Sequence, residues 1–183
     1  MFKKILITSI LALVAVVGVF AGVVAMQPSE FHVERSATIA APPSVVFAQV
    51  NDFHHWDAWS PWTELDPDAK VTFEGPAAGT GAIFKWSGNS DVGEGSMTIT
   101  ESQPYERIQI RLDFVKPLAG TSTVHFTFKP QGNQTVVTWS MNGRNNFISK
   151  AMCLFMDMDK MIGDKYEEGL ANLNAVVKAK ANQ

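Results

Sequence analysis

The side chains in this chain that are best suited to proton transfer are two adjacent histidines, His54 and His55, followed by Asp57. Imidazole and carboxylate groups can act as general acids and bases near neutral pH. A mononuclear metal site needs three or four converging ligands, whereas adjacent side chains in a strand or loop point in different directions. We therefore retain His54 and His55 as catalytic candidates beside the interpretation that they are solvated loop residues. We predict neither a metal site nor a cofactor.

No motif for nucleophilic catalysis is present in the sequence. A Gly-x-Ser-x-Gly elbow is absent, and the single cysteine, Cys153, stands among Met152, Leu154 and Phe155, which favours a buried structural thiol. One cysteine also excludes an internal disulfide and a cysteine-based zinc site. The glycines within 75–81 and 93–95 lack the strand-to-helix context of a phosphate loop, and we interpret them as turns and bulges.

Three of the five tryptophans, Trp56, Trp59 and Trp62, recur at intervals of three residues. An indole buries a large apolar area and keeps one N–H donor, which suits an apolar ligand pocket with few polar groups. Packing of a loop against a sheet is the alternative interpretation of these three side chains.

The elements that position these residues follow from hydrophobic periodicity. Apolar side chains occupy every second position in 107–115 and 121–129, which is typical of antiparallel strands covered on one face. A short helix is expected at 44–50, after Pro42 and Pro43. Strands are predicted at 31–40, 70–74, 82–87, 93–102, 107–115, 121–129 and 135–141.

A long amphipathic helix is predicted at the end of the chain, because apolar residues recur every three or four positions from Asn146 to Val177. Asn145 or Asn146 is its candidate N-cap, and Gly163 and Gly169 are candidate breaks. A run of hairpin strands followed by one covering helix predicts a single α+β domain over residues 31–180.

Several short sequence segments, together with the order of the predicted elements, resemble the START-like, helix-grip superfamily. The resemblance is specifically to the polyketide cyclase/dehydrase-like group, also called SRPBCC proteins. The resemblance implies a seven-stranded antiparallel curved sheet around a long C-terminal helix, with a deep and largely apolar cavity between them. It also implies binding of lipids, sterols, polyketides or other hydrophobic compounds, which a minority of members cyclise, dehydrate or hydrolyse. The residues that carry it are Ile39-Ala40-Ala41-Pro42-Pro43, Asp52-Phe53, Trp56, Trp59-Ser60-Pro61-Trp62, Val137-Thr138-Trp139-Ser140-Met141, Met161-Ile162-Gly163-Asp164 and Glu168-Gly169-Leu170-Ala171-Asn172-Leu173.

Given such a cavity, alternation with Val137 points Trp139 and Met141 at the helix. The methionines of the helix could repack around ligands of varied shape, although filling an irregular core is the alternative. The predicted ligand-binding residues are Trp56, Trp59, Phe84, Trp86, Ile110, Leu112, Phe126, Trp139, Met141, Met152, Phe155, Met156 and Met161.

The first 26 residues form a separate segment, joined to the domain by a linker at 27–30. Ile5 to Met26 is a run of 22 residues without an ionisable side chain, about 33 Å long as a helix, which is enough to cross a bilayer. Because Lys3 and Lys4 precede it, an uncleaved anchor would leave the N-terminus cytoplasmic and the domain exported, periplasmic or extracytoplasmic. A cleaved secretory signal ending near Val23-Val24-Ala25 is the alternative, and it would secrete the domain.

Composition excludes some partners. The net charge is −3, but without Lys3 and Lys4 the rest has 13 basic and 18 acidic side chains, a charge of −5. This argues against nucleic acid and against docking on anionic lipid through a polybasic patch. Our leading hypothesis is a membrane-anchored module that binds a hydrophobic small molecule or lipid. The alternatives are a cyclase, dehydratase or hydrolase acting in the same cavity, and an envelope or stress interaction protein with a vestigial cavity.

Overall fold

The computed structural model describes residues 2–181, so Met1, the first residue of the predicted segment 1–26, lies outside the described residues. The chain divides into two compact units. One contains the N-terminal residues to Phe31 together with Asn145–Asp157, and the other contains His32–Arg144 and the chain from Met158 onward.

The larger unit is built on one antiparallel sheet, as predicted. Its strands follow the order β1-β7-β6-β5-β4-β3-β2. Each strand from β2 to β6 therefore pairs with the strand that follows it in the sequence, and β1 pairs with β7. The strands are β1 (Glu30–Ile39), β2 (Lys70–Glu74), β3 (Ile83–Ser87), β4 (Glu94–Gln103), β5 (Arg107–Lys116), β6 (Gly120–Gln131) and β7 (Gln134–Arg144).

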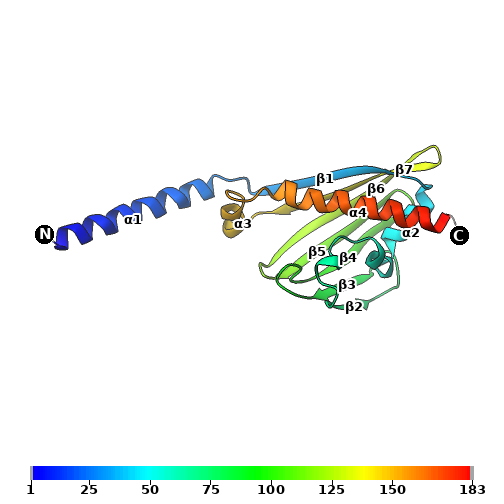
Figure 1. The fold of residues 1–183 in the computed structure, drawn as a ribbon, viewed down its shortest axis with the longest axis horizontal. Helices are drawn as coiled ribbons and strands as arrows, with labels where there is room; N and C mark the ends of the chain where they lie inside the picture. The colour runs from blue at the N-terminus through cyan, green and yellow to red at the C-terminus, as the bar shows by residue number, and fades with distance from the viewer. Residues whose placement is uncertain (1, 182–183) are drawn as a thin grey trace. The chain divides into compact units, whose positions relative to one another are not determined.

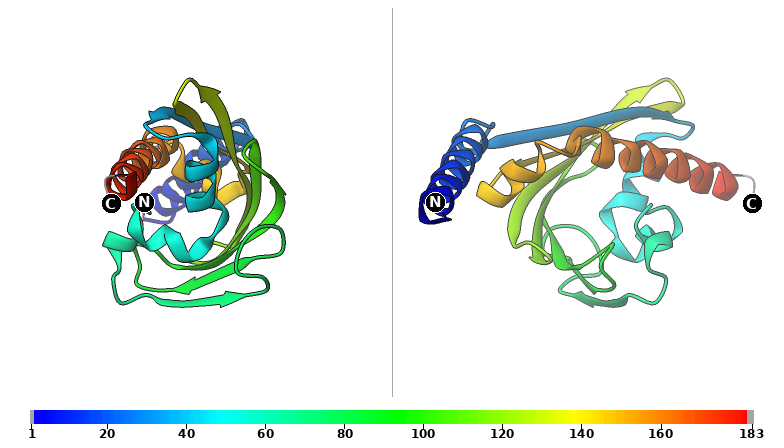
Figure 2. Two further views of the ribbon diagram at one scale, coloured as in Figure 1. Left: turned by 90° about the vertical axis from the view of Figure 1, so that its right-hand side faces the viewer. Right: turned by 60° about the vertical axis from the view of Figure 1, so that its left-hand side comes forward.

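Helix α4 (Met158–Ala181) lies along the concave face of this curved sheet (Figures 1 and 2). Its Leu170 and Leu173 are buried together with Ile110 and Phe126 of the sheet, and this is the main hydrophobic core. Burial of such side chains is the dominant favourable contribution to folding. Between β1 and β2 lie α2 (Pro43–Asn51), η1 (Phe53–Ala58) and η2 (Thr63–Leu65). The helix-grip fold implied by the sequence is therefore confirmed.

The predicted continuous helix from Asn146 is wrong in one respect, because the chain forms two helices there. Asn146 caps α3 (Phe147–Met152), accepting a hydrogen bond from the Ser149 amide at 2.9 Å. Tight turns at 153–157 then end α3, with the Phe155 amide donating to the Met152 carbonyl at 2.9 Å. Apolar spacing continued across these five residues, so periodicity did not reveal the interruption.

The two glycines predicted as candidate breaks lie inside α4, which continues through both. A side-chain carbon at Gly163 would overlap the Arg35 guanidinium, and one at Gly169 would come within 2.8 Å of the Trp139 ring. Both glycines therefore allow close approach of a neighbouring side chain rather than ending the helix.

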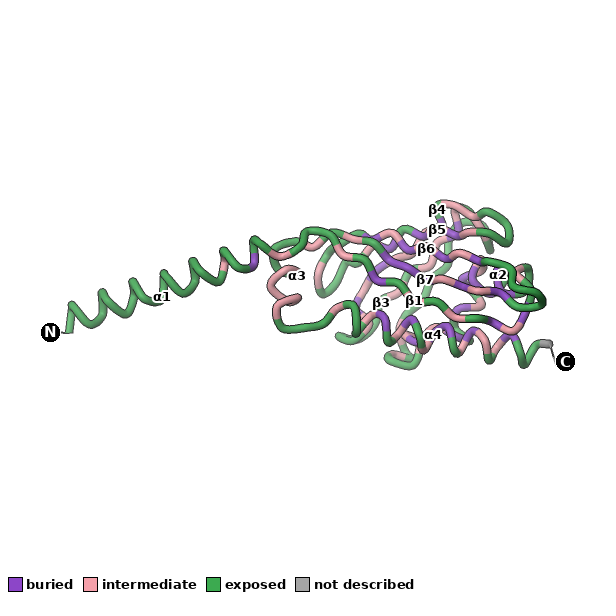
Figure 3. The backbone as a smooth tube through the Cα atoms, turned by 90° about the horizontal axis from the view of Figure 1, so that it is seen from above, coloured by how far each residue is buried: buried purple, intermediate pink, exposed green. Residues whose placement is uncertain are grey.

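The smaller unit contains α1 (Phe2–Ala25) and α3. Among the described residues, α1 is the one helix long and apolar enough to cross a membrane, and a signal sequence would have the same properties. It is exposed along almost its whole length, Val24 being its only buried described residue (Figure 3).

Candidate functional site

Four aromatic side chains form a connected row on the concave face of the sheet. Phe73 of β2 lies opposite Phe84 of β3, with ring centroids 5.6 Å apart. Phe84 stacks on Trp86 at 6.0 Å, and Trp86 meets Phe114 of β5 edge-on at 6.0 Å. We call Phe73, Phe84, Trp86 and Phe114 the aromatic row. Phe114 alternates with Leu112 and Ile110 on β5, which places the row on the face that α4 covers elsewhere.

Gly95 allows Trp86 to reach across β4. It lies opposite Trp86 in the sheet, and a side-chain carbon there would come within 2.6 Å of the indole ring. The Trp86 N–H is satisfied by the Val92 carbonyl at 2.9 Å. The indole can therefore present its apolar face without leaving a polar group unpaired.

The aromatic row is open, in contrast to the core beside it. Phe73 is 43% and Phe114 37% exposed, and Phe84 and Trp86 are half-buried. On the same face, Ile110 and Phe126 are completely buried. The concave face is thus divided into a covered part beneath α4 and an apolar part that no other described side chain fully covers.

His54 stands at one end of the row. Its ring stacks on Phe73, with centroids 4.0 Å apart and planes 22° apart. Its Nδ1 lies 2.7 Å from Oδ1 of Asp52. Because an ionised carboxylate only accepts, Nδ1 is the donor in this pair and Nε2 keeps its lone pair while the ring is neutral. This geometry orients His54 as a candidate base.

The Asp52 carboxyl is held in its charged form by its neighbours. Burial raises its pKa, but hydrogen bonds from the His54 backbone and side chain, together with the nearby charge of His55, lower the net pKa below the ordinary value of 3.8. Asp52 also accepts the His54 amide at 2.9 Å as the cap of η1. The second predicted histidine, His55, is directed elsewhere and donates from Nδ1 to the Ala48 carbonyl at 3.1 Å.

Trp56 of η1 and Trp59, which follows η1, pack against Phe126 and Trp139 on the covered part of the concave face. Both are buried, their rings are 4.7 Å apart, and both make edge contacts with Trp139. Their N–H groups donate to backbone carbonyls of α2. This arrangement favours the packing interpretation, and their role as ligand contacts stays a prediction.

Trp139 is stacked on Tyr166 of α4, with centroids 4.0 Å apart and planes 10° apart. Burial raises the pKa of the Tyr166 hydroxyl, and the nearby Trp139 N–H opposes that shift. This N–H is buried and meets no acceptor in hydrogen-bonding geometry among the described residues. An unpaired buried donor has a free-energy cost of about 1–3 kcal/mol, so it is a candidate partner for a polar atom.

The remaining predicted site residues fall into two groups. Ile110, Leu112, Phe126 and Met141 are buried on the covered part of the concave face, and Met161 is half-exposed on α4. Met152 ends α3, while Phe155 and Met156 lie in the turn after it, in the smaller unit. No ligand-binding role is tested for any of them, so these assignments stay predictions. Reasoning from the sequence missed Phe73, Phe114, Asp52 and Tyr166, although alternation with Ile110 and Leu112 pointed to Phe114.

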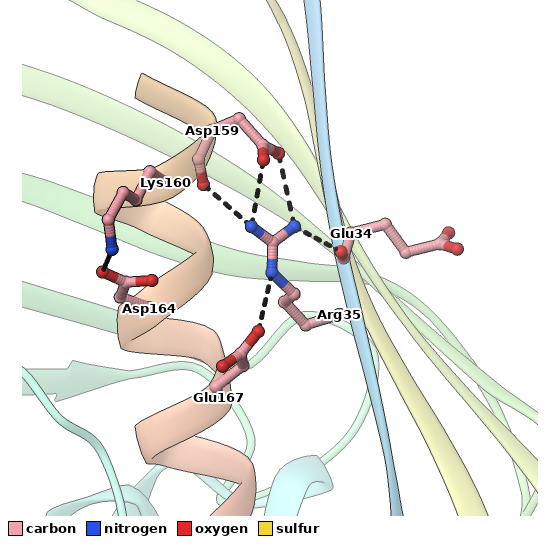
Figure 4. A network of polar contacts seen from close by, with 6 residues as sticks. All are labelled: Glu34, Arg35, Asp159, Lys160, Asp164 and Glu167. Carbon is pink, nitrogen blue, oxygen red and sulfur yellow. Dashed lines mark hydrogen bonds and ion pairs between the residues drawn. The ribbon is translucent and has the colours of Figure 1, made fainter. Parts of the chain in front are cut away.

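Arg35 of β1 fixes the start of α4 (Figure 4). Its guanidinium donates to the Asp159 carboxylate at 3.0 Å, to the Asp159 carbonyl at 3.2 Å and to the Glu167 carboxylate at 3.1 Å. The hydrogen bond with Arg35 lowers the pKa of Asp159. Within residues 2–181, no group of three histidine, cysteine or acidic side chains is arranged to hold a metal ion.

The comparisons with known proteins agree with this architecture. Residues 30–178 match the family model for polyketide cyclase/dehydrase and lipid transport proteins. A sequence comparison with curated proteins gives no match.

Similar solved structures share the fold at low sequence identity. A protein from Mesorhizobium loti is 14% identical with a TM-score of 0.60, covering 81% of this chain and 98% of its own. A protein from Chromobacterium violaceum is 17% identical with a TM-score of 0.57, covering 82% and 98%. The di-domain ARO/CYC protein StfQ of the steffimycin biosynthetic pathway is 12% identical with a TM-score of 0.60, and the match covers 85% of this chain and 53% of StfQ.

Proposed function

Because this chain belongs to the polyketide cyclase/dehydrase and lipid transport family, we propose that it binds a hydrophobic small molecule or lipid on the concave face of its sheet. The aromatic row is the contact surface, and α1 anchors the protein to a membrane. Domain and anchor correspond to residues 31–180 and 1–26, joined by the linker 27–30.

The observation that carries this proposal is the exposure of the aromatic row. Phe73 and Phe114 leave more than a third of their surface in contact with solvent, although they adjoin a completely buried core. Contiguous exposed apolar patches are typical of ligand and interaction sites, because they are costly to leave in water. An exposed aromatic surface of this kind suits an alkyl chain or a flat ring system. The row ends at His54 and Asp52, so a suitable ligand is mostly apolar with a polar group near one end.

Membrane attachment is supported by the length, composition and exposure of α1. With Lys3 and Lys4 retained on the cytoplasmic side, the domain lies outside the cytoplasm. Cleavage after Ala25 would secrete it instead, and the mass of the mature protein distinguishes the two outcomes.

Native mass spectrometry of the full chain, released from detergent micelles, tests binding. We expect the protein to retain an apolar molecule from its host, or to take one up from a panel of fatty acids, phospholipids and polycyclic aromatic compounds. Failure to retain any molecule, with no uptake from the whole panel, would overturn the proposal. Lipid extraction of the same sample would identify a retained molecule.

The Asp52 and His54 pair supports acid/base catalysis as a second candidate function, because a carboxylate that orients an imidazole beside an apolar surface suits general base catalysis. Incubating the retained molecule with the wild type and with His54→Gln would test it. If the protein catalyses dehydration or hydrolysis, the wild type should form products whose total mass differs from that of the retained molecule by one water. The variant should form them much more slowly. An unchanged molecule in both samples would exclude dehydration and hydrolysis of that compound.

A further inference from the structure

We propose that Asn145–Asp157, which we call the interfacial segment, lies at the boundary between headgroups and acyl chains of the membrane that α1 crosses. This inference rests on the membrane anchoring in the proposed function. It gives the protein a second membrane contact, which comes from a segment located between β7 and α4 in the sequence.

Hydrogen bonds join the interfacial segment to the linker that follows α1, and a longer one joins it to the last residue of α1, all within the smaller unit. The Asn145 amide donates to the Ser29 carbonyl at 2.9 Å, and its side chain donates to the Pro28 carbonyl at 3.3 Å. Further along, Lys150 Nζ reaches the Ala25 carbonyl at 3.5 Å. Helices α1 and α3 are also in contact with one another. The depth of α1 in a membrane therefore determines the depth of α3.

The length of α1 places that contact at the membrane boundary. From Lys4 to Ala25 the helix advances 21 residues, or about 32 Å, while the hydrocarbon core is about 30 Å thick. With Lys4 among the headgroups on one side, the Ala25 carbonyl reaches the edge of the hydrocarbon on the other. Lys150 and α3 then lie at the same level.

Most of the exposed residues of the interfacial segment are apolar, Asn146 and Asp157 being the polar ones. Phe155 is 79% exposed, and Phe147 and Ile148 are each 54% exposed. By contrast, Val24 near the end of α1 is completely buried. Amphipathic helices that lie in a membrane interface bury Phe, Leu and Trp side chains at the boundary between headgroups and acyl chains. Lys150 and Asp157 offset each other in charge, so we expect contact to depend on apolar area rather than on anionic lipid.

Depth-dependent quenching in the full chain tests this. In a Cys153→Ser background the chain has no other cysteine, so a fluorophore can be placed at Phe155→Cys, at Val14→Cys within α1, or at Asn133→Cys in the exposed turn between β6 and β7. Each protein is reconstituted in phosphatidylcholine vesicles that carry a quencher either near the glycerol or at the end of the acyl chain.

We expect the Phe155→Cys probe to be quenched mainly by the shallow quencher, the Val14→Cys probe mainly by the deep one, and the Asn133→Cys probe by neither. If the Val14→Cys probe is deeply quenched but the Phe155→Cys probe stays accessible to aqueous iodide, the anchor holds and this inference is wrong. A Phe155→Cys probe shielded from both iodide and lipid quenchers would also overturn it, indicating that a second copy covers the segment. An unquenched Val14→Cys probe would overturn the anchor itself and the inference with it.

Discussion

Gly163 of α4 lies so close to the guanidinium of Arg35 on β1 that a side-chain carbon at position 163 would overlap it. The glycine leaves room for the guanidinium to reach Asp159 and Glu167, on either side of it along the helix. A residue that is unfavourable for helix formation is thus part of the contact that holds the helix to the sheet.

Replacing Gly163 by alanine should therefore be less favourable to stability in the wild type than in an Arg35→Ala background. In the wild type, Gly163→Ala displaces the Arg35 guanidinium from Asp159 and Glu167, and the loss of these ion pairs should offset the stabilisation of about 1 kcal/mol that alanine gives to a helix. With Arg35→Ala already present, the same change should be neutral or stabilising by up to about 1 kcal/mol. Urea unfolding of the four proteins, followed by tryptophan fluorescence, measures the coupling. Equal effects in both backgrounds would contradict the assigned contact.

The contact between Arg35 and Asp159 should weaken in acid. The hydrogen bond and charge of Arg35 lower the pKa of Asp159 below its ordinary value of 3.8, so the folded state favours the ionised carboxylate. This stabilisation is complete above the ordinary pKa and is lost as the pH falls through the lower folded-state value. Unfolding midpoints measured below about pH 5 should depend less on pH in Asp159→Asn than in the wild type. Asp164→Asn, whose partner Lys160 is on the same helix, is the control and should change the slope less.

His125 should contribute a separate pH dependence. Burial lowers its pKa, the charge of Arg107 lowers it further, and Glu101 partly opposes these effects. The folded state therefore disfavours the protonated ring, and stability should decline as the pH falls below the ordinary pKa of 6.5 toward the folded-state value. His125→Gln should remove this decline in thermal unfolding between about pH 5 and pH 7.5. A decline of the same size in the variant would assign it to other groups.

Two buried tryptophans that differ in their N–H partners should tolerate phenylalanine differently. The Trp56 N–H donates to the Val50 carbonyl at 2.9 Å, whereas the Trp139 N–H lies near the Tyr166 hydroxyl but meets no acceptor in hydrogen-bonding geometry among the described residues. Trp56→Phe loses a hydrogen bond, while Trp139→Phe removes an unpaired buried donor. We expect Trp139→Phe to lower the free energy of unfolding by about 1–2 kcal/mol less than Trp56→Phe. Equal losses in urea unfolding would indicate that the Trp139 donor is satisfied in solution.

The sequence was most informative where a short-range pattern decides the structure. Alternation predicted β5 and β6 to within two residues, because one face of each strand is buried and the other is not. It did not reveal the five residues that separate α3 from α4, because apolar spacing continues across them. The pairing of His54 was also missed. Asp57 stands beside the histidines in the sequence, whereas Asp52, the cap of η1, is the carboxylate that binds His54.

The candidate site was only half predictable for a different reason. Phe84 and Trp86 were predicted as ligand contacts from their strand, but Phe73 and Phe114 were not. Phe73 and Phe114 differ from Ile110 and Phe126 in how far other parts of the chain cover them on the concave face. That extent depends on tertiary packing, which alternation along a strand does not encode.

Photochemical crosslinking to the full chain in detergent tests the central claim most directly, using a fatty acid with a diazirine in its alkyl chain. Peptide mapping should place the crosslinks on β2, β3 and the end of β5. Phe84→Ser should reduce them strongly, whereas Ile83→Ser, the adjacent residue on the opposite face of β3, should not. Crosslinks confined to α1 and the interfacial segment, or equal yields in the two variants, would contradict binding at the aromatic row.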